Sequence, residues 1–188
     1  MRKQILFTLL LFVTTITSIN AQTEVSGVKV PATLNVEGNE LILNGAGLRE
    51  KMWIDLYVGS LYLPKKSSNA AEIMSSLEAQ AIKLNIVSGM ITSEKMINAV
   101  NEGFENSTNG KTAPLKAKIE KFKSFFKDEI KKGDEFVIAY VPGKGVVVTK
   151  NGTLKGVIDG ADFKKALFGI WLSNKPADKD LKDGMLGK

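Results

Sequence analysis

The alternation of apolar and polar residues along the chain predicts several β-strands. We expect strands at 28–36, 41–43, 51–63, 81–87, 135–141, 145–149 and 153–158. Asn151-Gly152 predicts a hairpin turn between the last two of them. The strand at 51–63 is apolar on both faces, so a core or a ligand must cover it on both sides. Before it, residues 44–47 carry two glycines, which predict a tight turn that brings Arg49 to the start of this strand.

Apolar residues at helical spacing predict helices between these strands. We expect helices at 69–77, from an N-cap at Thr92 or Ser93 to about 108, from an N-cap at Thr112 to 133, at 161–172 and at 178–185. In the second of these, Met96, Val100 and Phe104 recur every four residues and form one buried stripe. Strands in runs, a helical pair in the middle and helices at the end indicate an α+β fold. Its plan is a large antiparallel β-sheet with a layer of α-helices on one face.

The start of the chain has the pattern of a secretory signal. Arg2 and Lys3 precede an apolar segment at 5–19, which is short for a membrane span, and a small residue follows it. We therefore expect residues 1–21 to be cleaved and 22–188 to form a single domain. The expected location is the periplasm of a Gram-negative-type envelope, with secretion as the second choice and an uncleaved anchor as the alternative.

Composition narrows the chemistry that this chain can perform. The sequence contains no cysteine and no histidine, which removes disulfides, thiol chemistry and the commonest general base. We expect no metal site and no cofactor; Glu50 stands where a dinucleotide loop needs its third glycine. The net charge is +6, but lysines alternate with acids. This pattern indicates no nucleic-acid partner and no membrane span, and only weak contact with an anionic membrane surface.

Arg49 is the residue with the most specific candidate role. An arginine beside an apolar strand suggests an anion held next to an apolar cavity. The alternative is a surface arginine that pairs with Glu50 or Asp55 and contributes little to stability.

Three segments carry a resemblance to a known family. Residues 45–49 (GAGLR), 56–63 (LYVGSLYL) and 163–172 (FKKALFGIWL), the last continuing to Lys175-Pro176, resemble the bacterial chalcone-isomerase-like family from Val28 to Gly187. The resemblance implies a large antiparallel sheet, a helical layer and a ligand cleft between them. It also implies two known uses, because plant enzymes of the superfamily cyclise chalcones and other plant members bind fatty acids. Both place an arginine that matches Arg49 in the cleft.

The other family positions match unevenly. Thr92 stands where the plant enzymes carry a tyrosine, and Ala99 stands where they carry an asparagine. Ile170 replaces a small hydroxyl residue, and Tyr57 replaces a threonine. Lys83 is the candidate for the basic residue of the family.

The resemblance therefore implies a non-catalytic protein that binds a fatty acid or a similar apolar carboxylate. Arg49 would pair with the carboxylate and Tyr57 would donate a second hydrogen bond, with Lys83 and Thr92 as further ligand contacts. The alternative is an isomerase of the intramolecular lyase type acting on a chalcone-like enone. In that case Arg49 and Lys83 would stabilise an oxyanion, and Thr92 or Tyr57 would order a water.

A third interpretation is an envelope scaffold without a ligand. Its cleft would be filled by aromatic side chains, with Trp53, Tyr57 and Trp171 belonging to the core.

Overall fold

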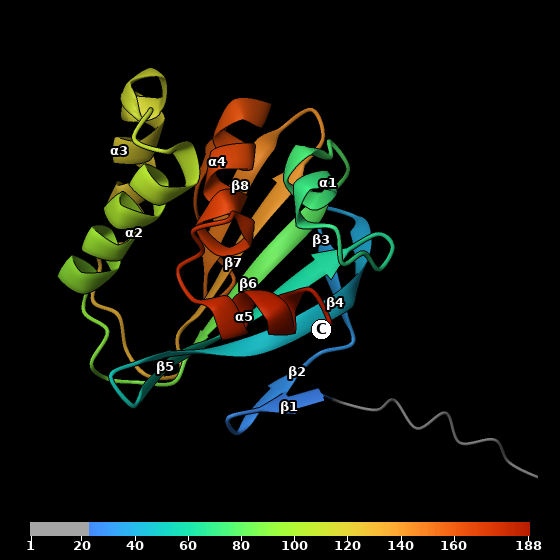
Figure 1. The fold of residues 1–188 in the computed structure, drawn as a ribbon, viewed down its shortest axis with the longest axis vertical. Helices are drawn as coiled ribbons and strands as arrows, with labels where there is room; N and C mark the ends of the chain where they lie inside the picture. Colours follow the sequence, from blue (N-terminus) through green and yellow to red (C-terminus); the bar gives the residue numbers. More distant parts are fainter. Residues whose placement is uncertain (1–22) are drawn as a thin grey trace, which may run out of the picture.

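The computed structural model describes residues 23–188, which form one large antiparallel sheet with helices on one face (Figure 1). Seven strands pair in the order in which they follow each other along the chain, so every neighbour is antiparallel. They are β3 (Thr33–Val36), β4 (Asn39–Lys51), β5 (Ile54–Leu63), β6 (Gln80–Ile86), β7 (Glu135–Val141), β8 (Gly145–Lys150) and β9 (Thr153–Ile158). This confirms the α+β plan.

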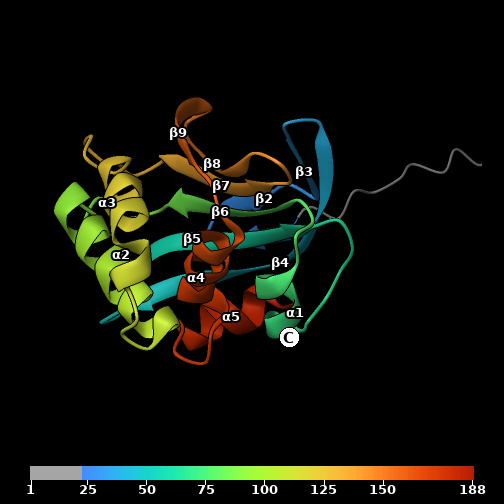
Figure 2. The ribbon, with the colours of Figure 1, turned by 90° about the horizontal axis from the view of Figure 1, so that it is seen from above.

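The helices form the layer that the sequence predicted, as Figure 2 shows from above. They are α1 (Ala70–Ser75), α2 (Ser93–Thr108), α3 (Lys116–Ser124), α4 (Ala161–Leu172) and α5 (Lys179–Met185). A cluster of phenylalanines packs between α2, α3, α4 and the sheet: the Phe104 and Phe163 rings are 5.5 Å apart, and the Phe126 and Phe136 rings are 5.1 Å apart. No helix within residues 23–188 has the length and hydropathy of a membrane span.

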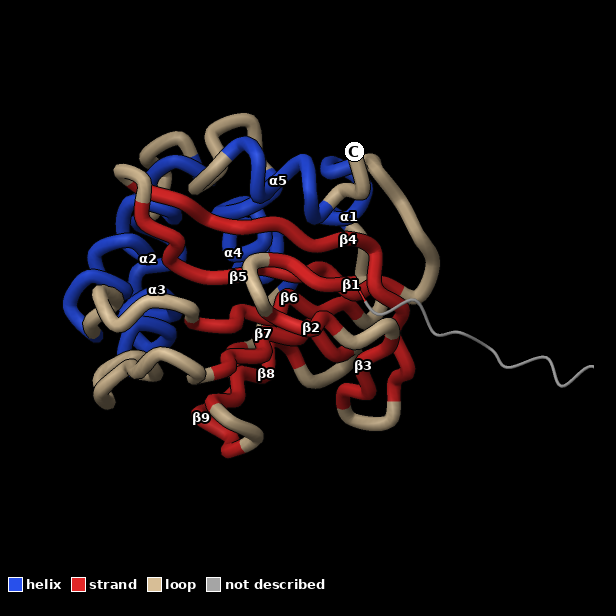
Figure 3. The backbone as a smooth tube through the Cα atoms, turned by 90° about the horizontal axis from the view of Figure 1, so that it is seen from below, coloured by secondary structure: helices blue, strands red, loops and turns tan. Residues whose placement is uncertain are grey.

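A short hairpin covers part of the opposite face of the sheet (Figure 3). Its strands are β1 (Thr23–Val25) and β2 (Val28–Val30). Val30 packs in a second apolar cluster with Val58 and Tyr62 of β5, while Leu61 of β5 packs under the helices. The strand that is apolar on both faces is therefore covered on both faces, as its sequence required.

The predicted glycine turn is wrong. β4 continues through Gly45 and Gly47, with register shifts between Leu43 and Gly45 and between Arg49 and Glu50, and the chain reverses later, at residues 52–53. The glycines serve helix packing instead. A Cβ on Gly47 would lie 3.0 Å from the Leu181 Cα of α5, so the absence of a side chain lets α5 lie directly on the strand.

Two predicted elements are divided in the structure. The strand expected at 28–36 is split at Pro31 into β2 and β3, which belong to different sheets, because proline has no N–H for a ladder. The helix expected at 112–133 is a 3-10 turn, η1 (Ala113–Leu115), followed by α3, which ends at Ser124. Phe125 and Phe126 bury their rings beyond that end.

The helix cap predicted at Thr112 is tested by the structure, whereas the signal predicted at residues 1–21 is not. Thr112 stands at the N-cap position of η1, but its side chain makes no capping hydrogen bond; its hydroxyl donates to a Glu105 carboxylate oxygen instead. The predicted cleavage of residues 1–21 concerns a segment outside the described residues.

The close contact between α5 and β4 gives a testable prediction. A Cβ on Gly184 would lie 2.6 Å from the Ala46 carbonyl oxygen and 2.9 Å from the Gly47 Cα, both backbone atoms that cannot rotate away. Gly184→Val should therefore lower the free energy of unfolding by about 1–3 kcal/mol, measured by urea denaturation. Gly89→Ala is the control, because a Cβ there meets nothing within 4 Å. Equal stability of the two variants would show that α5 does not need this contact.

Candidate ligand-binding site

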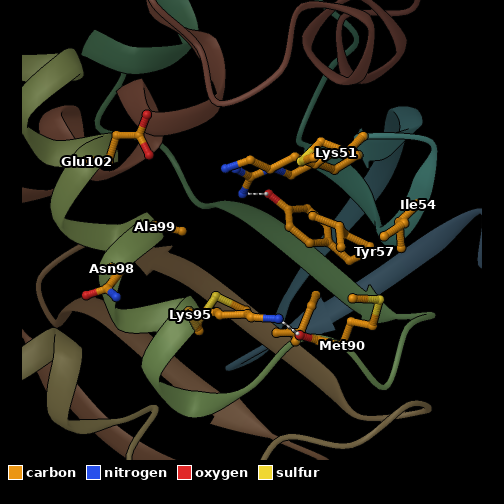
Figure 4. A pocket seen from close by; sticks show the side chains of 13 residues that line it. Lys51, Ile54, Tyr57, Met90, Lys95, Asn98, Ala99 and Glu102 are labelled. Atoms are coloured by element: carbon orange, nitrogen blue, oxygen red, sulfur yellow. Dashed lines mark hydrogen bonds between the residues drawn. The ribbon is translucent and has the colours of Figure 1, made fainter.

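Arg49 and Tyr57 lie opposite each other on β4 and β5, near the turn that joins these strands. The Arg49 side chain is half-buried, and its Nη1 donates a hydrogen bond of 3.4 Å to the Tyr57 hydroxyl, drawn as a dashed line in Figure 4. The guanidinium carbon also lies 5.5 Å from the centre of the Tyr57 ring. The antiparallel register thus brings together two predicted ligand-binding residues.

The Tyr57 hydroxyl is held in place from two sides. Trp171 of α4 donates its indole Nε1–H to this oxygen at 2.9 Å, and Arg49 donates the second bond. Both neighbours are donors only, so the phenol can only accept from them. Within residues 23–188 the Tyr57 hydroxyl proton has no acceptor, which leaves it available for a ligand.

A pocket of about 370 Å³ opens beside this pair, between the β4–β5 hairpin and α2 (Figure 4). Its volume lies within the range of roughly 300–1,000 Å³ that is usual for small-molecule sites. Most of its exposed wall is apolar. The lining residues besides Arg49 and Tyr57 are Lys51, Met52, Ile54, Leu56, Met90, Ile91, Lys95, Met96, Asn98, Ala99 and Glu102.

The pocket carries more positive than negative charge. Arg49, Lys51 and Lys95 line it, against one carboxylate, Glu102. Arg49 has no carboxylate within 4.0 Å among residues 23–188, so the interpretation as a paired surface arginine is wrong for the described chain. The Asp55 carboxylate instead accepts a 2.6 Å hydrogen bond from the Ser26 hydroxyl.

The structure does not bring Lys83 into this pocket. Its neighbours Ile82 and Leu84 pack under the helices, so the two-residue period of β6 turns Lys83 toward the other face of the sheet. Its Nζ lies 2.9 Å from a carboxylate oxygen of Glu135.

Thr92 is close to the pocket in sequence but does not line it. It is the N-cap of α2, as predicted, and its Oγ1 accepts the backbone N–H of Lys95 at 3.2 Å. Its side chain is exposed, and the pocket is lined by its neighbours Met90 and Ile91.

Three polar lining residues, Lys95, Asn98 and Glu102, escaped the sequence analysis. They stand three and four positions apart on α2, which places them on one face of the helix beside the buried Met96. Asn98 directly precedes Ala99, the position where the family resemblance expected an asparagine. The sequence signal that could have identified them is this polar stripe on α2, which lies next to the apolar stripe that contains Met96.

Tyr57 and Trp171 are both buried, as the scaffold interpretation expects, but Trp53 is 94% exposed, so its assignment to the core is wrong. Among residues 23–188 no group of three acidic side chains is placed to hold a metal ion.

Comparison with known proteins establishes the family. The family model described as chalcone isomerase-like matches residues 22–187, which is almost the whole chain. The chain belongs to the chalcone isomerase-like family. No curated protein matches it.

A solved structure supports the fold of this chalcone isomerase-like protein. The crystal structure of an Arabidopsis thaliana fatty-acid-binding protein aligns with a TM-score of 0.66 over 85% of this chain and 92% of that chain. The two sequences are 19% identical, so the likeness concerns the fold.

Proposed function

We propose that this protein binds a fatty acid or a similar apolar carboxylate in the pocket between the β4–β5 hairpin and α2, without catalysing a reaction. The observation that carries this proposal is the pairing of the Arg49 guanidinium with the Tyr57 hydroxyl at the edge of an apolar pocket. These two donors have no carboxylate acceptor among the described residues, and an incoming carboxylate would satisfy both. The fatty-acid-binding protein of Arabidopsis, which has this fold, supports the same function.

The two ends of such a ligand contribute to the binding free energy in different ways. Each methylene moved from water into the apolar part of the pocket contributes about 0.8 kcal/mol. A hydrogen bond to a charged group contributes about 1.5–3 kcal/mol net. The alkyl tail would therefore set most of the affinity, and Arg49 with Tyr57 would set the orientation and the preference for acids.

The placement of two residues favours binding over isomerase chemistry. An isomerase of the predicted type would use Lys83 beside Arg49 to stabilise an oxyanion, and the hydroxyl of Thr92 or Tyr57 to order water. Of Lys83, Thr92 and Tyr57, only Tyr57 lines the pocket with Arg49. Lys83 lies on the other face of the sheet, paired with Glu135, and Thr92 caps α2 outside the pocket.

Export through a cleaved segment at 1–21 is also part of the proposal, and sequencing the N-terminus of the mature protein tests it.

Titration with saturated straight-chain acids tests the proposed function. Affinity should rise about fourfold for each added methylene, from about 0.8 kcal/mol per group, until the pocket is full. Mass spectrometry of the natively purified protein should also show a co-purified apolar acid. An affinity that does not depend on chain length would contradict a tail-binding pocket. Turnover of a chalcone above its spontaneous rate would favour the isomerase.

A further inference from the structure

Within residues 23–188, four hairpins are closed by two-residue turns in which both residues have positive φ. The pairs are Ser26-Gly27 (46° and 75°), Glu37-Gly38 (51° and 80°), Asn151-Gly152 (50° and 78°) and Met52-Trp53 (52° and 65°). Such turns favour Asn or Asp first and Gly second, because a side chain in this region is crowded by its own backbone. Three of the four turns have glycine at the second position, as this preference predicts. The β4–β5 turn is the exception, because it has tryptophan there. Backbone preference therefore does not explain Met52-Trp53.

The side chains of this turn are unusually exposed for their type. Trp53 is 94% exposed and Met52 is 81% exposed, and Met90, across the pocket mouth, is 50% exposed. We call Met52, Trp53 and Met90 the apolar tip. Half of the six large apolar side chains that are exposed within residues 23–188 belong to it. An apolar group of this kind, set in a strained turn, indicates a surface that is covered in use.

Charged residues are segregated around the apolar tip. Lys51 and Lys95 line the pocket on the side of the helices, and neither has an ion-pair partner among the described residues. The acids of the same hairpin, Glu50 and Asp55, do not line the pocket, and Asp55 bonds Ser26 of the β1–β2 hairpin on the other face. Among the described residues, Glu102 of α2 is the one acid that lines the pocket, against Arg49, Lys51 and Lys95, so the lining of the pocket is cationic on balance as well as apolar.

We propose that the apolar tip docks on the surface of a lipid bilayer that contains anionic headgroups. Tryptophan prefers the boundary between headgroups and acyl chains, methionine fills the apolar side, and lysine reaches back to the phosphates. Met52 and Met90 also line the pocket, so docking would place the pocket mouth against the membrane. This inference rests on the proposed function, because a bilayer is where a long-chain acid partitions and where a carrier can load or release it.

Trp53→Gly is the variant that isolates docking. Trp53 does not line the pocket, and glycine gives the β4–β5 turn the residue that the other three turns use at that position. The variant should fold at least as stably as the wild type and bind soluble fatty acid unchanged. In co-sedimentation with vesicles of phosphatidylcholine and phosphatidylglycerol, its apparent affinity should fall at least tenfold. Lipids brominated in the acyl chain should quench the tryptophan fluorescence of the wild type.

Leu154→Ser is the matched control. Leu154 is 56% exposed beside the Asn151-Gly152 turn at the far edge of the sheet, and its replacement should leave vesicle binding unchanged. The wild type and both variants have the same N-terminus, so any contribution of that segment to vesicle binding is the same in all three proteins.

Each outcome of this experiment decides for or against docking. Vesicle binding by Trp53→Gly equal to that of the wild type, or no vesicle binding by the wild type, would overturn the docking proposal. Sedimentation that shows Trp53 holding two copies of the chain together would overturn it too, in favour of self-association. Vesicle binding by the wild type that is lost in Trp53→Gly, with no binding of soluble fatty acid by either protein, would support docking and contradict the proposed function.

Discussion

Arg49→Met should weaken the binding of a long-chain acid by roughly 10- to 150-fold, which corresponds to a charge-assisted hydrogen bond of about 1.5–3 kcal/mol. The neutral alcohol of the same chain length should bind both proteins almost equally. The reason is that the Arg49 guanidinium has no carboxylate partner among residues 23–188 and is already aligned with the Tyr57 hydroxyl. Calorimetric titration of both ligands into both proteins measures the difference.

Lys51→Met is the matched control for this prediction. It removes the same charge from the same hairpin and the same pocket, but Lys51 has no hydrogen bond to Tyr57. It should reduce acid binding by less than the Arg49 change. Tyr57→Phe should cost the acid about 1.5–3 kcal/mol by removing one hydrogen bond to the charged carboxylate. If Arg49→Met weakens the acid and the alcohol equally, the role of Arg49 is structural and the proposed head-group site is wrong.

Lys164→Met should lower the free energy of unfolding by about 1–3 kcal/mol, the cost of leaving buried acceptors unpaired. Lys164 of α4 is 1% exposed, and its ammonium donates to three backbone carbonyls at the end of α1. These are Ile73 at 2.7 Å, Met74 at 3.1 Å and Ser76 at 2.8 Å. Methionine keeps the length of the side chain but leaves the carbonyls unpaired. Lys165→Met, an exposed neighbour on the same helix, should change stability little.

The same residue predicts a dependence on pH. Burial lowers the pKa of Lys164 from 10.5 to about 8, even though the three carbonyls favour the ammonium. Between these two values the unfolded chain binds more protons than the folded chain, so the stability of the wild type should rise with pH relative to Lys164→Met. Urea denaturation of both proteins from pH 7.5 to about 10 measures this change. A constant difference in stability would show that the pKa of Lys164 is not lowered.

Local patterns were sufficient for the parts of this protein that short-range rules govern. The two-residue period of β6 and the spacing of Met96, Val100 and Phe104 on α2 predicted the sheet and its helical layer. The hydroxyl cap at Thr92 and the Asn151-Gly152 hairpin were also found in this way. Each of these features is decided within a few residues, so tertiary contacts did not change it.

Long-range packing explains the errors. Residues 44–47 suggested a turn because glycine has local freedom, but the same lack of a side chain serves the approach of α5, which follows more than 130 positions later, as Gly47 beside Leu181 shows. Lys83 was assigned to the site although its place depends on which face of β6 meets the helices. The residues next to Gly47 and Lys83 in the sequence do not determine the packing of α5 or the face of β6 that meets the helices.

The sequence by itself determined the order of the elements, the strand that needs cover on both faces and the presence of an arginine suited to an acid. The tertiary structure decided which residues share the pocket with Arg49. The β4–β5 register placed Tyr57 opposite Arg49, and α4 brought the Trp171 indole to the Tyr57 hydroxyl. The physical reason is that hydrophobic periodicity is a property of each segment, whereas a site depends on the faces that segments far apart in the chain turn toward each other.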